Sequence, residues 1–197
     1  MRIISGKFKG MRLATPPGKS NAIRPTSDRC REALFSILGE RLDDATILDL
    51  YAGTGALALE ALSRGAKSAV LVDNSSTALA LLRKNVLRLK KYNIDNPDFC
   101  QSITIIKSDL RKGLNAIVRS SKSTSTTFDI IFLDPPYGKG LAQRTLKDLD
   151  SNSFLATGGL VVAEERSKVV LSEKFAHLKC IDTRKYGDTR FWIYTIS

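Results

Sequence analysis

Four consecutive residues, Asp134-Pro135-Pro136-Tyr137, have the composition of a site that could hold an amine for chemistry. The apolar run before them, Ile130 to Leu133, predicts a buried strand, so the motif would lie at the carboxyl edge of a sheet, where open α/β folds bind ligands. Each proline lacks an N–H donor and has a fixed φ, which makes the segment rigid and rich in carbonyl acceptors.

The amine of a nucleobase is a poor nucleophile because its lone pair is delocalised into the ring. The Asp134 carboxylate and the Pro135 carbonyl could accept its two hydrogens, orient the nitrogen and stabilise the positive charge that develops there. Tyr137 offers a flat face on which a base can stack. The structural alternative for this motif is a proline-rich turn after a strand, with the tyrosine packed on it.

A glycine-rich turn, with glycines at 53 and 55, lies between an expected strand (46–50) and an expected helix (56–64). Glycines allow the backbone to turn tightly and to approach a ligand. A carboxylate at Asp73, after the next expected strand, is well placed for both ribose hydroxyls of a nucleoside. The predicted cofactor site therefore comprises this turn and its neighbours: Asp49, Tyr51, Gly53, Gly55, Asp73 and Asn74.

Asp49 discriminates between the two cofactors that fit such a turn. A carboxylate before the first glycine would repel the pyrophosphate of NAD, but it suits the ammonium and sulfonium of S-adenosylmethionine. No basic side chain lies near the turn to hold phosphates. Asp109, after the third expected strand, could accept from the adenine amine or could cap a helix. The sequence therefore favours S-adenosylmethionine over NAD.

These sites require strands that alternate with helices, and the chain of 197 residues shows that alternation. Apolar spacing predicts a helix from 27 to 38 before the first strand. The segments that follow the first crossover are expected to be strands at 68–72, 102–107, 128–133 and 159–163 and helices at 75–91, 110–119 and 140–150. Such a pattern predicts one α/β domain with a mostly parallel, doubly wound sheet. Two antiparallel strands at about 177–184 and 190–196 are expected to end it, and the polar insert 120–127 to be a surface loop.

The basic charge of the chain points to a polyanionic partner. The formal net charge is +11, and residues 1–31 hold eight basic side chains against one acid. Short β-like pieces at 2–5 and 12–14 suggest a projecting basic hairpin. The residues expected to contact nucleic acid are Lys7, Lys9, Arg12 and Arg29. A second basic cluster, Arg83 to Lys91, could equally be a solvated helix face.

Several other classes of protein are excluded or disfavoured by composition. Cys30, Cys100 and Cys180 are too far apart for a metal knuckle or a disulfide framework and favour a reducing cytoplasm. With a single histidine, His177, no metal site is expected. Neither a membrane-spanning apolar run nor a signal-peptide core is present in the sequence.

Two N-terminal stretches make the chain resemble a known family. The glycine turn followed by Asp-Pro-Pro-Tyr is similar to class I methyltransferases that modify exocyclic amines of nucleic-acid bases. The stretches Arg2 to Gly10 (RIISGKFKG) and Arg24 to Phe35 (RPTSDRCREALF) resemble the RsmD family, bacterial enzymes that methylate a guanine N2 in small-subunit (16S) ribosomal RNA. The resemblance covers nearly the whole chain.

The resemblance implies a class I methyltransferase, Rossmann-like fold with a seven-stranded sheet, and S-adenosylmethionine as donor with S-adenosylhomocysteine as product. It places catalysis at Asp134 to Tyr137 and suggests that Arg24 and Thr26 lie near the methionine carboxylate. Some relatives carry an acid where this chain has Ser75. We expect a basic extension (1–25) on a catalytic core (26–197), acting as a cytoplasmic monomer on ribosomal RNA, naked or in an assembling subunit.

Three alternatives remain open from the residues. Adenine N6 is a rival target, in DNA or RNA, because enzymes with that activity share Asp-Pro-Pro-Tyr. A binding module could keep the fold without turnover, and an NAD-dependent oxidoreductase could use the same kind of glycine turn.

Overall fold

A mixed sheet forms the centre of the molecule. The computed structural model describes residues 1–16, 28–93, 102–114, 117 and 127–196. Its helices are α1 (Asp28–Leu38), α2 (Ala56–Ser63), α3 (Ser76–Tyr92) and α6 (Leu141–Asp150), with 3-10 turns η1 (Gly39–Leu42) and η2 (Leu110–Lys112). Its strands are β1 (Thr46–Leu50), β2 (Ser68–Asp73), β3 (Ile103–Lys107), β4 (Phe128–Leu133), β5 (Leu155–Arg166), β6 (Leu178–Tyr186) and β7 (Thr189–Ile196).

The strand order confirms the doubly wound fold. In the described residues seven strands pair in the order β3-β2-β1-β4-β5-β7-β6, and β1 to β5 pair only in parallel with one another. β7 runs antiparallel to β6, as the C-terminal sequence predicted, and it also pairs antiparallel with β5. The order reverses between β1 and β4, and such a switch point is where open α/β sheets bind ligands.

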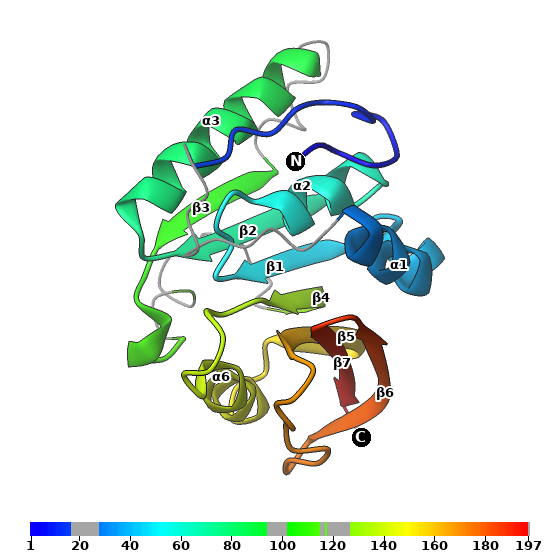
Figure 1. Cartoon of the computed structure of the whole chain (residues 1–197), viewed down its shortest axis with the longest axis vertical. Helices are drawn as coiled ribbons and strands as arrows, with labels where there is room; N and C mark the ends of the chain where they lie inside the picture. Colours follow the sequence, from blue (N-terminus) through cyan, green and yellow to red (C-terminus); the bar gives the residue numbers. More distant parts are fainter. Residues whose placement is uncertain (17–27, 94–101, 115–116, 118–126, 197) are drawn as a thin grey trace.

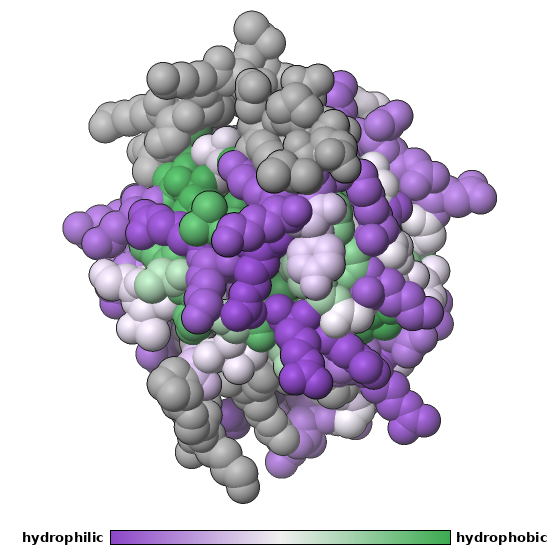
Figure 2. All heavy atoms as spheres, turned by 90° about the horizontal axis from the view of Figure 1, so that it is seen from above, coloured by the Kyte–Doolittle hydropathy of each residue, from purple (hydrophilic) through white to green (hydrophobic). Residues whose placement is uncertain are grey.

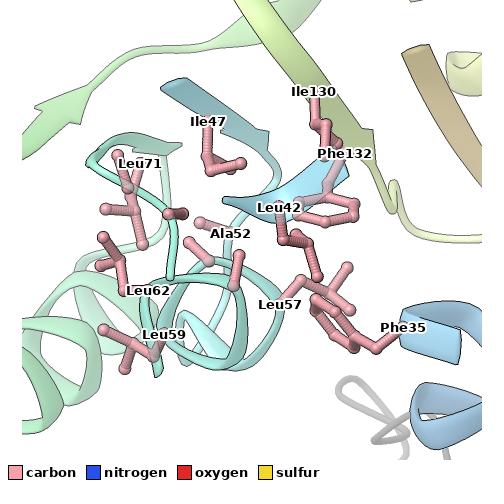
Figure 3. Close-up of a cluster of buried hydrophobic side chains, with 14 of the residues drawn as sticks. Phe35, Leu42, Ile47, Ala52, Leu57, Leu59, Leu62, Leu71, Ile130 and Phe132 are labelled. Atoms are coloured by element: carbon pink, nitrogen blue, oxygen red, sulfur yellow. The ribbon is translucent and has the colours of Figure 1, made fainter. Parts of the chain in front are cut away.

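Two clusters of buried apolar side chains pack on the two faces of the sheet. One cluster joins the N-terminal segment, α1, α2 and α3 to the sheet, and part of it is drawn in Figure 3, where Phe35 of α1 and Phe132 of β4 lie beside each other. Their ring centroids are 5.9 Å apart. The other cluster is formed by side chains of the sheet together with those of η2 and α6. The sheet is thus packed with apolar side chains on both faces.

Residues 1–16 form a chain reversal that packs on the helices, which corrects the expectation of a projecting element. Arg2 and Arg12 form a single antiparallel bridge instead of two strands. Four apolar side chains of this segment are buried in the first core cluster: Ile3, Phe8, Met11 and Leu13. The alternation of these side chains with basic ones is what allows one side to enter the core.

Side chains of α2 tie that segment down. Buried Glu60 accepts the N–H groups of Ile4 at 2.6 Å and Ser5 at 3.0 Å. Gly6 has φ +79°, and a Cβ there would lie 1.8 Å from the carbonyl oxygen of Ser63, so only glycine fits. The segment is therefore part of the folded body, beside α2 and α3 (Figure 1).

Two expected elements differ from those observed. The helix expected at 110–119 begins with the 3-10 turn η2, because Asp109 caps it through the N–H of Arg111 at 3.1 Å; residues 115–116 and 118–119 lie outside the described part. β5 is longer than the expected 159–163, with a register shift against β4 between Phe128 and Ile130. No helix of the described residues is long and apolar enough to cross a membrane.

Candidate active site

The predicted cofactor and catalytic motifs meet at the switch point of the sheet. Leu50 at the end of β1 pairs with Val72 of β2 on one side and with Leu133 of β4 on the other. The residues after these strand ends are therefore neighbours, and the N–H of Asp134 lies 3.4 Å from the carbonyl oxygen of Leu50. The register alone brings the glycine turn beside Asp-Pro-Pro-Tyr.

The glycine turn is fastened to the end of β2. The N–H of Gly53 donates to Asp73 Oδ2 at 2.9 Å, and the N–H of Ala52 donates to the carbonyl of Val72 at 3.0 Å. Gly55 starts α2 with φ +78°, and a Cβ at that position would lie 2.4 Å from Leu82 Cδ1. A side chain here would collide with α3, so the sequence keeps glycine where the turn meets the helix layer.

Asp49 is a buried carboxylate without a cation beside it in the described residues. Its side chain is 2% exposed, and its Oδ2 accepts the N–H of Ala58 in α2 at 3.1 Å. Burial raises the pKa of Asp49 to about 7, the Ala58 hydrogen bond opposes that rise, and the charge of Asp73 adds to it. An ammonium group brought by a ligand would supply the missing counter-charge.

Asp73 and Asp109 both accept hydrogen bonds from backbone N–H groups. Asp73 accepts from Gly53 and, through Oδ1, from the N–H of Ser75 at 2.8 Å. A carboxylate oxygen has two lone pairs, so these bonds leave acceptor capacity for ribose hydroxyls. Asp109 caps η2 and holds the Arg111 guanidinium with two 2.8 Å bonds, which lower the pKa of Asp109 to about 2. Asn74 is exposed next to Asp73.

Asp134 lies in a strongly acidic setting at the end of β4. Burial and the negative charges of Glu164, Asp49 and Glu165 raise the pKa of Asp134. Pro135 is buried and Pro136 is exposed. A cluster of carboxylates that repel one another has its strongest attraction for a positively charged group or a donor that enters the site.

Tyr137 is anchored by a residue that sequence reasoning missed. Its hydroxyl donates to Glu164 Oε1 at 2.5 Å, and Arg166 lies 5.8 Å from the ring centroid. Glu164 is 2% exposed and follows the buried run Leu160 to Ala163 of β5. That signal was available in the sequence, because an acid directly after a buried parallel strand falls on the same ligand-binding edge as Asp134.

Tyr51 has a strained backbone at the same edge. Its φ is +63°, a region that side chains other than glycine rarely adopt. Its hydroxyl lies 3.1 Å from Thr145 Oγ1 of α6, and Thr145 is buried. Such strain is typical of ligand sites whose surroundings hold the residue in place.

The predicted nucleic-acid contacts fall on two elements. Lys7, Lys9 and Arg12 are exposed on the N-terminal segment, and Arg29 is exposed in the first turn of α1. Lys9 and Arg29 line one cavity of about 270 Å³ between these elements. Arg24 and Thr26 lie outside the described residues. Within the described ranges, no group of three or more metal-ligating side chains could hold a metal ion.

Comparison with known proteins decides the family. The family described as Conserved hypothetical protein 95 matches residues 1–195. The Escherichia coli K12 protein "Ribosomal RNA small subunit methyltransferase D" is 36% identical over 164 residues, covering 83% of this chain and 74% of its own. The chain belongs to the RsmD family. The family expected from the sequence is thereby confirmed.

Solved structures agree with the RsmD fold. The Escherichia coli yhhF structure has a TM-score of 0.79 at 31% identity and covers all of this chain and 98% of its own. A Salinibacter ruber RNA methyltransferase in complex with S-adenosyl-L-homocysteine has a TM-score of 0.60 at 15% identity, covering 88% of this chain and 94% of its own. The class I methyltransferase fold predicted from the sequence is confirmed by these likenesses.

Proposed function

We propose that this RsmD-family protein transfers a methyl group from S-adenosylmethionine to the exocyclic N2 of a guanine in small-subunit ribosomal RNA. Family membership supports methylation of ribosomal RNA as the reaction. The observation that carries the proposal is the register of β1 with β4, which sets Asp49 and the glycine turn next to Asp134.

The residues of the cofactor site fit S-adenosylmethionine. Asp49 is buried and has no counter-charge among the described residues, and Gly53 and Gly55 form a backbone turn held by Asp73. The cofactor supplies an electrophilic methyl group on a sulfonium that is a good leaving group. Asp49 then faces the ammonium end, and Asp73 binds the ribose with Asn74 and Tyr51 close by. Asp109 and the two residues outside the described part, Arg24 and Thr26, complete the proposed set.

The chain's own work at the target is orientation and electrostatics. Asp134 and the Pro135 carbonyl accept the two amine hydrogens, so the nitrogen lone pair is directed at the methyl carbon. As the N–C bond formed and the methyl–sulfur bond broke, positive charge would grow on nitrogen, and the carboxylates around Asp134 would stabilise it. The nitrogen would then release one proton to solvent. Pro136 keeps the segment rigid, and Tyr137 stacks on a base that has left its helix.

The test identifies the modified nucleoside. Ribosomal RNA from a strain that lacks this gene is incubated with the protein and S-adenosylmethionine carrying a labelled methyl group, then digested to nucleosides. We expect label only in N2-methylguanosine. Label in N6-methyladenosine would establish the rival target instead, and RNA binding without transfer would leave only a binding module.

The form of the substrate is a second part of the proposal. We infer a cytoplasmic monomer whose catalytic core (26–197) and basic extension (1–25) act on ribosomal RNA or on an assembling small subunit. Comparing methyl transfer to naked 16S RNA with transfer to partly assembled particles checks this. Sedimentation of the pure protein as a dimer would contradict the monomer.

A further inference from the structure

The N-terminal segment and α3 form one surface, joined by hydrogen bonds between them. Asn85 of α3 accepts the N–H of Ala14 through Oδ1 at 2.6 Å, and its Nδ2 donates to the Ala14 carbonyl at 3.2 Å. Three residues further along α3, Arg88 Nη1 donates to the carbonyl of Arg12 at 3.1 Å. Because Asn85 is fully buried, this joint belongs to the folded body.

Nearly all of the excess positive charge lies on these two elements. Residues 1–16 and α3 together hold nine of the 31 basic side chains and none of the 20 acidic ones. The rest of the chain is therefore almost balanced, with 22 basic and 20 acidic side chains. A solvated surface usually mixes both signs, so a region without any acid indicates a polyanionic partner.

Helical spacing places three of these charges in one stripe. Lys84, Arg88 and Lys91 follow each other at i, i+4 and i+7, so they share the face that meets Arg12. With a rise of 1.5 Å per residue, the stripe is about 10 Å long. Tyr92, which is 70% exposed, follows at its end. We call the four basic residues Arg12, Lys84, Arg88 and Lys91 the Arg12–α3 surface.

Hydrophilic side chains gather across this side of the molecule. Figure 2 views it from the side on which α3 and the N-terminal segment lie in Figure 1, and hydrophilic residues cross the middle of the described part of that face. Lys84, Lys91 and Arg12 are exposed, and none of the four residues pairs with a carboxylate in the described ranges. Among the described residues, these charges therefore have no acidic partner.

We propose that the Arg12–α3 surface binds the phosphate backbone of the RNA substrate, which rests on the function proposed above. The joint also reaches the cofactor turn, because Asn85 Nδ2 donates to the carbonyl of Thr54 at 2.9 Å. RNA held on this surface is therefore fixed relative to the glycine turn at the switch point. Contact with phosphates, not with base edges, makes this binding independent of sequence.

The test compares two triple variants with the same change in charge. One replaces Arg12, Lys84 and Lys91 by glutamine, and keeps Arg88 because its side chain supports the backbone. The matched control replaces Lys174, Lys179 and Lys185, which are exposed on or beside β6 at the other end of the sheet, by glutamine. The dissociation constant for a 16S RNA fragment is measured at several salt concentrations, together with affinity for S-adenosylhomocysteine.

The surface variant should bind RNA at least about tenfold more weakly at 0.1 M salt, and its log–log salt slope should be shallower by about 2, since each phosphate contact contributes about 0.7 on single-stranded RNA. The control variant should bind RNA with an affinity near that of the wild type. Both variants should bind S-adenosylhomocysteine with an affinity near that of the wild type. Equal RNA affinity and equal salt slope in the two variants would overturn the proposal that the Arg12–α3 surface binds RNA. Methyl transfer by the wild type is measured in parallel, so failure of the proposed function is seen separately as no transfer at all.

Discussion

The proposed active site and the proposed RNA-binding surface use charge in opposite ways. At the switch point of the sheet, Asp49, Asp134 and Glu164 are carboxylates held in or near the interior. On the Arg12–α3 surface, basic side chains stand in solvent without acids among them. In the proposed active site, desolvation strengthens each electrostatic interaction with a bound group. The exposed charges of the Arg12–α3 surface instead attract an anionic partner over a longer range.

The side chain of Asn85 joins the two regions. Asn85 is hydrogen-bonded to the N-terminal segment and to the glycine turn, so the basic surface and the acidic site cannot move independently without breaking hydrogen bonds of this buried side chain.

Asp134→Asn should have the largest effect. An amide keeps the shape of the side chain but loses the negative charge that stabilises positive charge on nitrogen, so kcat should fall by about 10² to 10³. Single-turnover transfer of a labelled methyl group measures this. Asp188→Asn, at an exposed turn, is the control for removal of one carboxylate. A loss below about threefold in Asp134→Asn would remove Asp134 from the chemistry.

Gly6→Ala tests how firmly the basic segment belongs to the fold. The new Cβ would meet the Ser63 carbonyl at a position with positive φ, so the free energy of unfolding should fall by about 2–4 kcal/mol. Gly10→Ala is the matched control, because Gly10 also has positive φ but nothing lies within 4 Å of the added atom. Its cost should be about 1 kcal/mol. Denaturant unfolding of both variants compares them, and equal costs would mean that the segment is not clamped on α2.

Asp49 should give cofactor binding a pH dependence. Its pKa of about 7 lies above the usual 3.8, so ionisation destabilises the fold, beginning near pH 4 and complete above pH 7. A ligand ammonium needs the ionised form, so affinity for S-adenosylhomocysteine should rise up to about tenfold per unit from pH 5 to pH 7 and then level off. Titration calorimetry across this interval measures it.

Asp49→Asn is the control for that pH dependence. The variant should bind more weakly at pH 8, with the slope below pH 7 reduced, and it should unfold at a higher denaturant concentration at pH 8 because no buried charge remains. An unchanged slope in Asp49→Asn would assign the titration to another group.

The sequence predicted those parts of the structure that depend on local pattern. Periodicity and turn residues predicted the strands at 46–50 and 128–133 and the antiparallel pair at the end of the chain. The pairing of those first two strands places Asp49 beside Asp134. The buried run before Glu164 could have placed this acid on the ligand-binding edge, but its bond to Tyr137, 27 positions away in the chain, leaves no local pattern. The packing of the N-terminal segment was missed because Glu60 and Ser63 look like ordinary polar residues of a helix until their backbone partners are known.

Tyr137→Phe should have the smallest effect and separates stacking from anchoring. The ring remains available to a base, but Glu164 loses a hydrogen bond inside the protein, so the fold should lose about 1–2 kcal/mol. The methyl-transfer rate should fall less than tenfold, far less than in Asp134→Asn, since no charge at the amine changes. Tyr137→Ala removes the ring as well and should raise KM for RNA, because base–aromatic stacking is worth about 1–3 kcal/mol. If Tyr137→Phe and Tyr137→Ala lowered methyl transfer equally, the site would require the hydrogen bond from the Tyr137 hydroxyl to Glu164 and not the face of the ring.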